Sequence, residues 1–335
     1  MLTSHSQLVL SVCIITFLTG LPANALAFYT FCKKVKKKPT PIDILLLNLT
    51  TSDLIFLIFL PFKMKEAADN MLWKLPYTLC PITGFVFYST IYNSTFFLTA
   101  VSVERYLGVA FPIRYKLYRR PLYTVVVSIF FWVLSSVNLS IVYIMPYYDP
   151  QNVSDSTSPT DCYREFTPKQ LQVLLPVRLE LCLLLFCVPF LISCFCYINF
   201  IRILSRLPNI SRRRRLRAIG LALGTLLVFA FCFGPYNVSH VVGFATKRSP
   251  DWRHIALLFS TFNACLDPLI FYFTSSAMRS TFSHCLTGLT ERLCRLHCHR
   301  PHCCPLQGPS NIDKYKEPGP HEGNACNDSP LPDIS

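Results

Sequence analysis

The chain has 335 residues, of which 52% are hydrophobic and only 15% are charged. This composition is more apolar than that of an ordinary soluble domain, and it excludes a disordered protein. Lys and Arg outnumber Asp and Glu by 32 to 18, and in so weakly charged a chain this excess should be concentrated in a few places. The composition argues against a nucleic-acid-binding protein, a collagen and a coiled coil.

Seven apolar segments are each long enough to cross the hydrocarbon core of a bilayer, which takes about 20 helical residues. In chain order they cover residues 8–31, 42–62, 77–103, 122–145, 171–201, 216–245 and 255–273. The first segment is not a cleaved signal peptide, because it lacks a basic leading region and a small-residue cleavage site. The sequence therefore predicts an all-α membrane protein built as a seven-transmembrane helix bundle.

The predicted organisation has four parts. An extracellular N-terminus covers residues 1–7, and the transmembrane domain covers residues 8–273. A short amphipathic cytosolic helix is expected at 274–287, followed at 288–335 by a disordered cytosolic tail rich in Pro, Gly and polar residues. No repeat of about 20 to 50 residues is visible, which disfavours a transporter built from two related halves.

Basic residues gather in alternate loops and set the predicted orientation. Lysines crowd residues 33–38 after the first span, four basic residues lie at 114–120 after the third, and arginines fill 202–217 after the fifth. The positive-inside rule then places the N-terminus outside the plasma membrane and the C-terminus in the cytosol. The arginines at 212–215 are interpreted first as a topology signal, with contact to anionic lipid or a cytosolic partner as the alternative.

Ionisable or amide side chains inside a membrane span need a functional reason, because an ion at the helix centre costs on the order of 3 kcal/mol. Four places stand out: Asn24, Asp53, the Glu104-Arg105-Tyr106 triplet, and Asp267-Pro268 with Tyr272. A polar residue can simply bond a neighbouring helix, so each place alone is a weak signal. Their order along the chain is the informative feature.

The chain resembles the rhodopsin-like family of G-protein-coupled receptors from Leu8 to about Cys285. The resemblance rests on motifs in all seven spans: Asn24, Leu49 to Asp53, Cys80 with Glu104-Arg105-Tyr106, Trp132, Pro189, Cys232 to Pro235, and Asp267 to Tyr272. It implies a heterotrimeric G protein and arrestin as partners. It also implies roles in activation for Glu104, Arg105, Tyr106, Phe233, Pro235, Asp267, Pro268 and Tyr272.

Within that family the sequence is most similar to the free fatty acid receptors of the short-chain branch. Three stretches carry this similarity, at residues 104–112, 175–181 and 233–240. The third separates the branches, because the long-chain member has Asn where this chain has His240. The resemblance implies activation by acetate, propionate or butyrate and signalling through inhibitory or calcium-mobilising G proteins.

Three basic side chains are expected to face one outer cavity, because Arg178, His240 and Arg253 lie near the outer ends of spans five to seven. Converging guanidinium groups repel each other unless an anion lies between them, and the planar fork of Arg suits a carboxylate. The resemblance implies that these residues bind the ligand carboxylate. It extends the ligand site to Tyr88, Tyr92, Tyr236, Asn138 and Glu180.

Less specific interpretations of the same residues stay open. Arg253 could extend from a helix end towards water, His240 could be a packing residue, and Arg178 could pair only with Glu180. Two positions depart from the family pattern: Asn138 replaces a usual His, and Arg164, with Glu165 after it, replaces an acid. Both positions bear on chain-length preference and potency.

The resemblance also implies a disulfide and an ion site. Cys80 and Cys162 are the cysteine pair expected on the oxidising side, and they predict a disulfide that ties an outer loop over the cavity. A sodium site is implied at Asp53, Ser94, Asn263 and Asp267. The alternative there is a single proton, because two buried carboxylates cannot both stay charged and unpaired.

Two kinds of modification are predicted. Asn152 begins the glycosylation sequon that would face the outside of the cell. Cys285, Cys294 and Cys298 follow the last span and are candidates for palmitoylation.

The sequence thus favours a receptor for short-chain carboxylates. A receptor for another anionic metabolite or a nucleotide is the nearest alternative, and a transporter or channel is the alternative from another class. An enzyme is not indicated, because no nucleophile and base pair or metal set is recognisable, and the 16 cysteines fall mostly as single residues in apolar runs. No cofactor is expected beyond the sodium ion.

Overall fold

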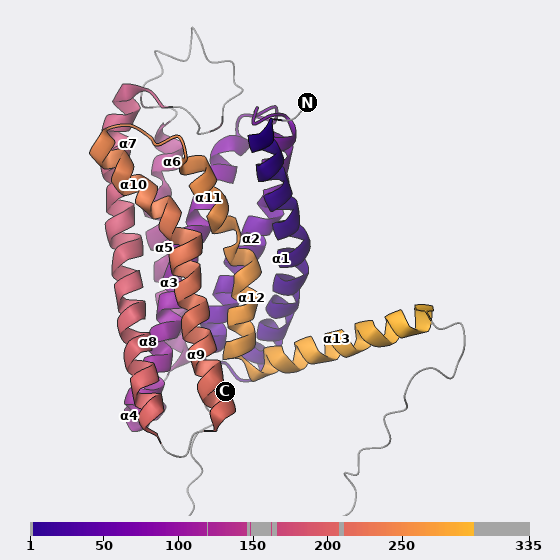
Figure 1. Ribbon diagram of the computed structural model, residues 1–335. Helices are drawn as coiled ribbons and strands as arrows, with labels where there is room; N and C mark the ends of the chain where they lie inside the picture. Colours follow the sequence, from indigo (N-terminus) through magenta and orange to yellow (C-terminus); the bar gives the residue numbers. More distant parts are fainter. Residues whose placement is uncertain are drawn as a thin grey trace, which may run out of the picture. The chain divides into compact units, whose positions relative to one another are not determined.

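The computed structural model describes residues 3–118, 120–145, 148, 162, 166–207 and 211–297, and within them all regular structure is helical. Residues up to Met278 form one compact unit, drawn in Figure 1. In chain order the helices are α1 (Ser4–Lys37), α2 (Pro41–Ala68), α3 (Leu79–Ala110), α4 (Pro112–Tyr118), α5 (Pro121–Leu139), α6 (Ile141–Ile144), α7 (Pro168–Glu180), η3 (Leu181–Cys187), α8 (Val188–Arg206), α9 (Arg212–Leu227), η4 (Val228–Phe233), α10 (Gly234–Thr246), α11 (Arg253–Thr261), α12 (Asn263–Thr274) and α13 (Ser276–His297).

Several of these elements join into single membrane-length rods. α7, η3 and α8 follow one another without a break, as do α9, η4 and α10, because π-helical turns replace α-helical ones in the middle of each rod. Among the described residues, six rods are long and apolar enough to cross a membrane: Ser4–Lys37, Pro41–Ala68, Pro121–Ile144, Pro168–Arg206, Arg215–Thr246 and Arg253–Thr274.

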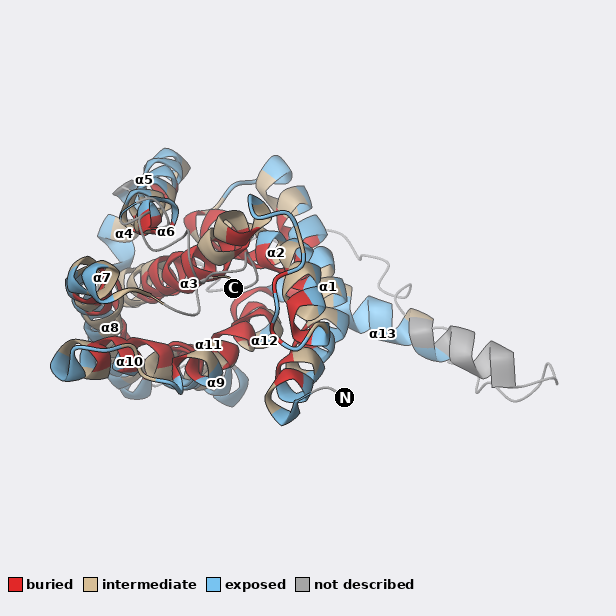
Figure 2. Cartoon of the chain, turned by 90° about the horizontal axis from the view of Figure 1, so that it is seen from above, coloured by how far each residue is buried: buried red, intermediate tan, exposed pale blue. Residues whose placement is uncertain are grey.

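The helix missing from that set is α3, which has 32 residues and lies in the interior of the compact unit. Nearly every side chain between Val86 and Ser102 is buried, and Figure 2 shows the buried colour along the helix. Ser, Thr, Asn and Tyr are frequent in this stretch because none of them faces lipid: Asn93, Ser94 and Thr99 bond neighbouring helices, and others bond the backbone of α3 itself. The predicted third span is therefore present but polar.

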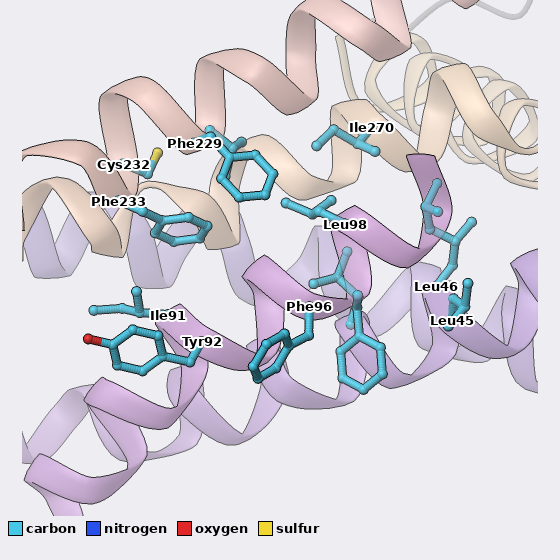
Figure 3. Close-up of a cluster of buried hydrophobic side chains, with 14 of the residues drawn as sticks. Leu45, Leu46, Ile91, Tyr92, Phe96, Leu98, Phe229, Cys232, Phe233 and Ile270 are labelled. Carbon is cyan, nitrogen blue, oxygen red and sulfur yellow. The ribbon is translucent and has the colours of Figure 1, made fainter. Parts of the chain in front are cut away.

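The core forms where α3 meets the helices around it. Figure 3 shows Ile91, Tyr92, Phe96 and Leu98 of α3 beside residues of α2, η4 and α12. Phe229 and Phe233 of η4 pack edge to face at a centroid distance of 6.2 Å, and both are fully buried. η4 continues directly into α10, the helix that carries part of the ligand cavity.

Helix bounds differ from the predicted segments mainly at the ends. α1 begins at Ser4, where Thr3 accepts a hydrogen bond from the Ser6 amide at 3.2 Å, so most of the predicted extracellular segment 1–7 is helical. α13 runs from Ser276 to His297, ten residues past the predicted end at 287. Apolar windows mark the part inside the bilayer, whereas a helix continues into water until its capping residues end it.

The outer ends of α2 and α3 are tied down by a disulfide and ion pairs. Cys80 is bonded to Cys162, which confirms the predicted disulfide. Beyond α2, Asp69 pairs with Lys65 at 3.1 Å and with Lys74 at 3.3 Å. The hydrogen bond from Lys65 and the contact with Lys74 lower the pKa of the Asp69 carboxyl below its ordinary value.

Candidate functional site

A small cavity of about 30 Å³ lies at the outer end of the bundle. Five side chains predicted for the ligand site line it, namely Tyr88, Tyr92, Arg178, Tyr236 and Arg253. Its apolar wall, which sequence reasoning missed, consists of Leu139, Ile141, Val142, Met145, Phe166, Leu174 and Leu181. Helical spacing could have identified Leu174, because it lies one turn before Arg178.

Arg253 begins α11 and is buried against two tyrosines. Its Nη2 atom donates a hydrogen bond of 2.8 Å to the hydroxyl of Tyr236. Its guanidinium carbon lies 5.2 Å from the ring centre of Tyr236 and 5.7 Å from that of Tyr88, within the range of a cation–π contact. With 4% of its surface exposed, Arg253 does not extend into water. Nε of Arg253 has no hydrogen-bond partner in the described part of the chain.

Arg178 lies across the cavity on α7 and is equally buried. Its Nη1 atom donates to the hydroxyl of Ser249 at 3.4 Å, and its guanidinium carbon lies 4.9 Å from the ring centre of Phe166. No ion pair joins Arg178 to Glu180 among the described residues, and Glu180 is exposed outside the cavity. Residues two apart on a helix point to different sides, which excludes the expected contact.

The two arginines repel each other, and none of the described lining residues is acidic. Two buried guanidinium groups that face one cavity without a carboxylate are costly to desolvate. Their tyrosine neighbours offset part of that cost through hydroxyl and ring contacts. The arrangement can therefore accept an anion, which would bridge the two cations.

His240 supports the cavity from behind and is not a lining residue. Its Nε2 atom lies 3.5 Å from the Tyr92 hydroxyl, and its ring packs edge to face on Tyr236 at 4.6 Å. Asn138 does not reach the cavity, because its amide nitrogen donates to the Leu134 carbonyl of its own helix at 2.8 Å. Of the predicted ligand residues, the structure thus separates His240, Asn138 and Glu180 from the lining.

The Glu104-Arg105-Tyr106 triplet lies at the opposite end of α3. The Glu104 carboxylate accepts a hydrogen bond from the Tyr115 hydroxyl in α4. The Nη2 atom of Arg105 donates to the Thr274 carbonyl at the end of α12, at 2.7 Å. The Tyr106 ring lies 5.8 Å from that of Phe195 in α8. Arg105 thereby links α3 to the last helix of the bundle.

The predicted pivot in the sixth span coincides with irregular backbone. Pro235 is the second residue of α10, which begins directly after η4 and the buried Phe233. Proline has no N–H group, so one backbone carbonyl in the preceding turn loses its helical donor. A π-helical segment before it absorbs the mismatch. In the seventh span, Pro268 lies inside α12, and Tyr272 is 41% exposed.

The predicted ion site contains buried oxygen atoms without partners. Asp53 and Asp267 are fully buried and close enough to interact with each other, and none of their four carboxylate oxygens accepts a hydrogen bond from another group in the described part of the chain. Asn263 donates to the Ser94 hydroxyl at 3.1 Å, and its own carbonyl oxygen is likewise unsatisfied. Oxygen ligands of this kind suit a hard cation such as sodium. A proton shared between the carboxylates would use the same atoms.

The predicted modification sites fall largely outside the described residues. Cys285 lies in α13 and is exposed. The Cys294 side chain, Cys298, Asn152 and the variant position Arg164 all lie outside the part of the chain whose side chains the structure describes. Those predictions stay predictions.

Comparisons with known proteins identify related sequences. A model of the family "7 transmembrane receptor (rhodopsin family)" matches residues 23–271. Free fatty acid receptor 3 of Mus musculus is 50% identical over 284 residues, which cover 85% of this chain and 88% of the relative. Free fatty acid receptor 2 of Rattus norvegicus is 52% identical over 279 residues, which cover 83% and 84%. Free fatty acid receptor 1 of Macaca fascicularis is 34% identical over 274 residues, which cover 79% and 90%.

Proposed function

Because the chain belongs to the rhodopsin family of seven-transmembrane receptors, we propose that it is a plasma-membrane receptor for short-chain carboxylates such as acetate, propionate and butyrate. Membership of this family makes it a multi-pass membrane receptor and not an enzyme. Its N-terminus lies outside the cell and its C-terminus in the cytosol. The ligand cavity then opens to the outside, and Arg105 faces a heterotrimeric G protein.

The pair of buried arginines is the observation that carries this proposal. Arg178 and Arg253 line one cavity that contains no described acidic side chain. A carboxylate between them replaces mutual repulsion by two charge-assisted contacts. The hydroxyl of Tyr236, already bonded to Arg253, holds that guanidinium in place before the ligand arrives.

The size of the cavity supports a small ligand. A water molecule needs about 10 to 15 Å³ of such space, so a volume of about 30 Å³ holds two or three water-sized groups. Acetate, with four heavy atoms, is of this order. A nucleotide is far larger than this cavity. The apolar wall around Leu174 would contact the short alkyl chain of propionate or butyrate.

Activation follows as a shift between two populations of the bundle. A carboxylate bridging Arg178 and Arg253 draws α7 and α11 together at their outer ends and favours the state in which they are closest. Tyr236 transmits the change to α10, which pivots at Pro235, where the backbone is already irregular. The other end of that rod moves away from α3, and Arg105 exchanges the Thr274 carbonyl for the G protein.

The test measures ligand response in cells that express the chain. Acetate, propionate and butyrate are applied, and the fall in cyclic AMP and the rise in calcium are recorded. Arg178→Ala and Arg253→Ala should each lose the response to millimolar acetate, because each removes one charged contact worth about 1.5 to 3 kcal/mol. Arg248→Ala, an exposed arginine in the α10–α11 loop, is the matched control and should respond normally.

Two results would contradict the proposal. One is a normal response of both alanine variants that reach the cell surface in parent amounts. The other is carboxylate uptake or current in vesicles that contain no G protein, which would indicate a transporter or channel.

A further inference from the structure

The outer cavity holds two positive charges in largely apolar surroundings. Arg178 and Arg253 are each only 4% exposed, and none of the described lining residues is acidic. Arg253 donates to the hydroxyl of Tyr236 and Arg178 to that of Ser249, so within the described part of the chain each guanidinium has a neutral acceptor and no ion-pair partner. A buried cation without a counter-charge is costly, because neutral acceptors replace only part of its hydration.

Hydrogen-bond donors remain unused beside this cavity. A guanidinium group has five N–H donors, and Nε of Arg253 is buried with no acceptor among the described residues. The rings of Tyr88 and Tyr236 are stacked at a centroid distance of 5.9 Å, and both lie within cation–π range of Arg253. Arg253 is therefore held in place by its neighbours while part of its donor capacity is free for an anion.

The size and the wall of the cavity select the kind of anion. A volume of about 30 Å³ takes two or three water-sized groups, which admits a monatomic anion. Leu139, Val142 and Leu181 belong to the wall and offer no side-chain donor. A phosphate or sulfate ion would turn some of its oxygens towards these side chains without hydrogen bonds, whereas a halide accepts contacts from any direction and leaves no oriented oxygen unsatisfied.

We propose that this cavity binds a chloride ion between Arg178 and Arg253 when no carboxylate is present, and that chloride competes with the carboxylate for the same two cations. This inference deepens the proposed function and rests on it for the outward position of the cavity, which faces the chloride of the extracellular fluid. Chloride neutralises the two arginines, but it has no alkyl chain for the apolar wall and only one atom for the two forked groups. It is therefore the weaker ligand.

Mass action sets the expected size of the competition. The ceiling on affinity per heavy atom corresponds, for a ligand of one atom, to a dissociation constant of about 0.1 M. The apparent dissociation constant of a competing carboxylate is multiplied by one plus the ratio of the chloride concentration to that constant. An increase in chloride from about 10 mM to about 500 mM should therefore weaken apparent carboxylate binding about fivefold.

The first test is a calorimetric titration of purified full-length receptor with propionate at these two chloride concentrations. The sodium salt of a bulky ring sulfonate, too large for the cavity, replaces the missing chloride, so sodium and ionic strength stay constant. We expect the apparent dissociation constant of propionate to be about fivefold higher at high chloride. Equal constants in the two buffers would overturn the proposal and leave the proposed function intact, because propionate would still bind.

The second test detects chloride without any carboxylate. Exchange of chloride with a protein site broadens the NMR signal of the free ion, and the parent receptor should show this excess broadening and lose it on addition of propionate. Arg178→Gln combined with Arg253→Gln should abolish it. The control pair Lys247→Gln and Arg248→Gln removes the same charge from exposed positions and should keep it.

Two results of the second test would overturn the proposal. Equal loss of broadening in the two double variants would mean that general charge attracts chloride. Undiminished broadening in the Arg178 and Arg253 variant would place the ion elsewhere. If that variant does not fold, the parent decides, since broadening that propionate leaves unchanged also contradicts a shared site. A chloride site supported by the variants, in a receptor whose cells respond to no carboxylate, would contradict the proposed function but not the chloride site.

Discussion

Arg253 and Tyr236 form the direct link between the outer cavity and the irregular segment of the sixth span. The bond from the guanidinium to the Tyr236 hydroxyl measures 2.8 Å, and Tyr236 is the residue next to Pro235. Arg253, which lines the ligand cavity, thus holds Tyr236, the residue beside the expected pivot at Pro235. Any anion that competes for Arg253 changes the forces on α10 at that point.

Removal of the Tyr236 hydroxyl tests this link. Tyr236→Phe keeps the ring that packs against Arg253 but loses the hydrogen bond, which with a charged donor is worth about 1.5 to 3 kcal/mol. We expect the half-maximal acetate concentration to rise at least tenfold at equal surface expression. Tyr143→Phe, on the partly exposed face of α6, is the control. An unchanged Tyr236→Phe dose–response curve would show that the bond is not used.

The affinity for acetate should be low. The best small ligands reach about −1.5 kcal/mol per heavy atom, so acetate has a ceiling of about −6 kcal/mol and propionate one of about −7.5 kcal/mol. These ceilings correspond to dissociation constants of tens of micromolar for acetate and a few micromolar for propionate, and ordering costs raise both towards hundreds of micromolar. Calorimetric titration of purified receptor checks the value. Submicromolar acetate binding would contradict a site built on these contacts.

The apolar wall should set the preferred chain length. Leu174→Ala removes three carbons from the wall of a cavity of only about 30 Å³. We expect potency to move from acetate towards butyrate and longer acids, since a methylene group in an apolar pocket changes binding by about 1 to 3 kcal/mol. Leu184→Ala, exposed to lipid on η3, serves as the control. An identical order of potency in parent and variant would contradict this role.

Signalling without ligand should be measurable. The start of α9 contains arginines and no acidic residue, so it offers no carboxylate that could hold Arg105 in the inactive state. Glu104→Gln should raise it further, since the variant loses the charge that accepts the Tyr115 hydroxyl and lies beside Arg105. Cyclic AMP is compared with that of mock-transfected cells after serum carboxylates are removed. Equal levels in the parent and mock-transfected cells would refute this expectation.

The buried carboxylates should make ligand affinity depend on sodium. Replacement of sodium by a bulky organic cation leaves Asp53 and Asp267 without the ion that their unsatisfied oxygens suit. We expect agonist affinity to change in the parent and to become insensitive to the cation in Asp53→Asn. Affinity that is the same in both salts would favour a shared proton.

Much of this protein follows from local sequence. Bilayer-length apolar runs predict the spans, because transfer of apolar side chains into lipid outweighs other terms there, and the charges between the runs predict their direction. The disulfide also follows from the sequence, because Cys80 and Cys162 are the cysteine pair expected on the oxidising side of the membrane. The sequence also predicts that Arg178, His240 and Arg253 lie near the outer ends of their helices.

Tertiary structure decided which of these side chains meet. Glu180 follows Arg178 by two residues, yet the rotation of the helix turns it outward, while Leu174 and Phe166 enter the wall. His240 lies behind Tyr92 and Tyr236 because the packing of α3 against α10 places the tyrosines in front. The position of Arg114 and Arg120 beside Glu104 depends on how α4 packs against α3. Such contacts join residues far apart in sequence, and only the packing of whole helices sets the distances between them.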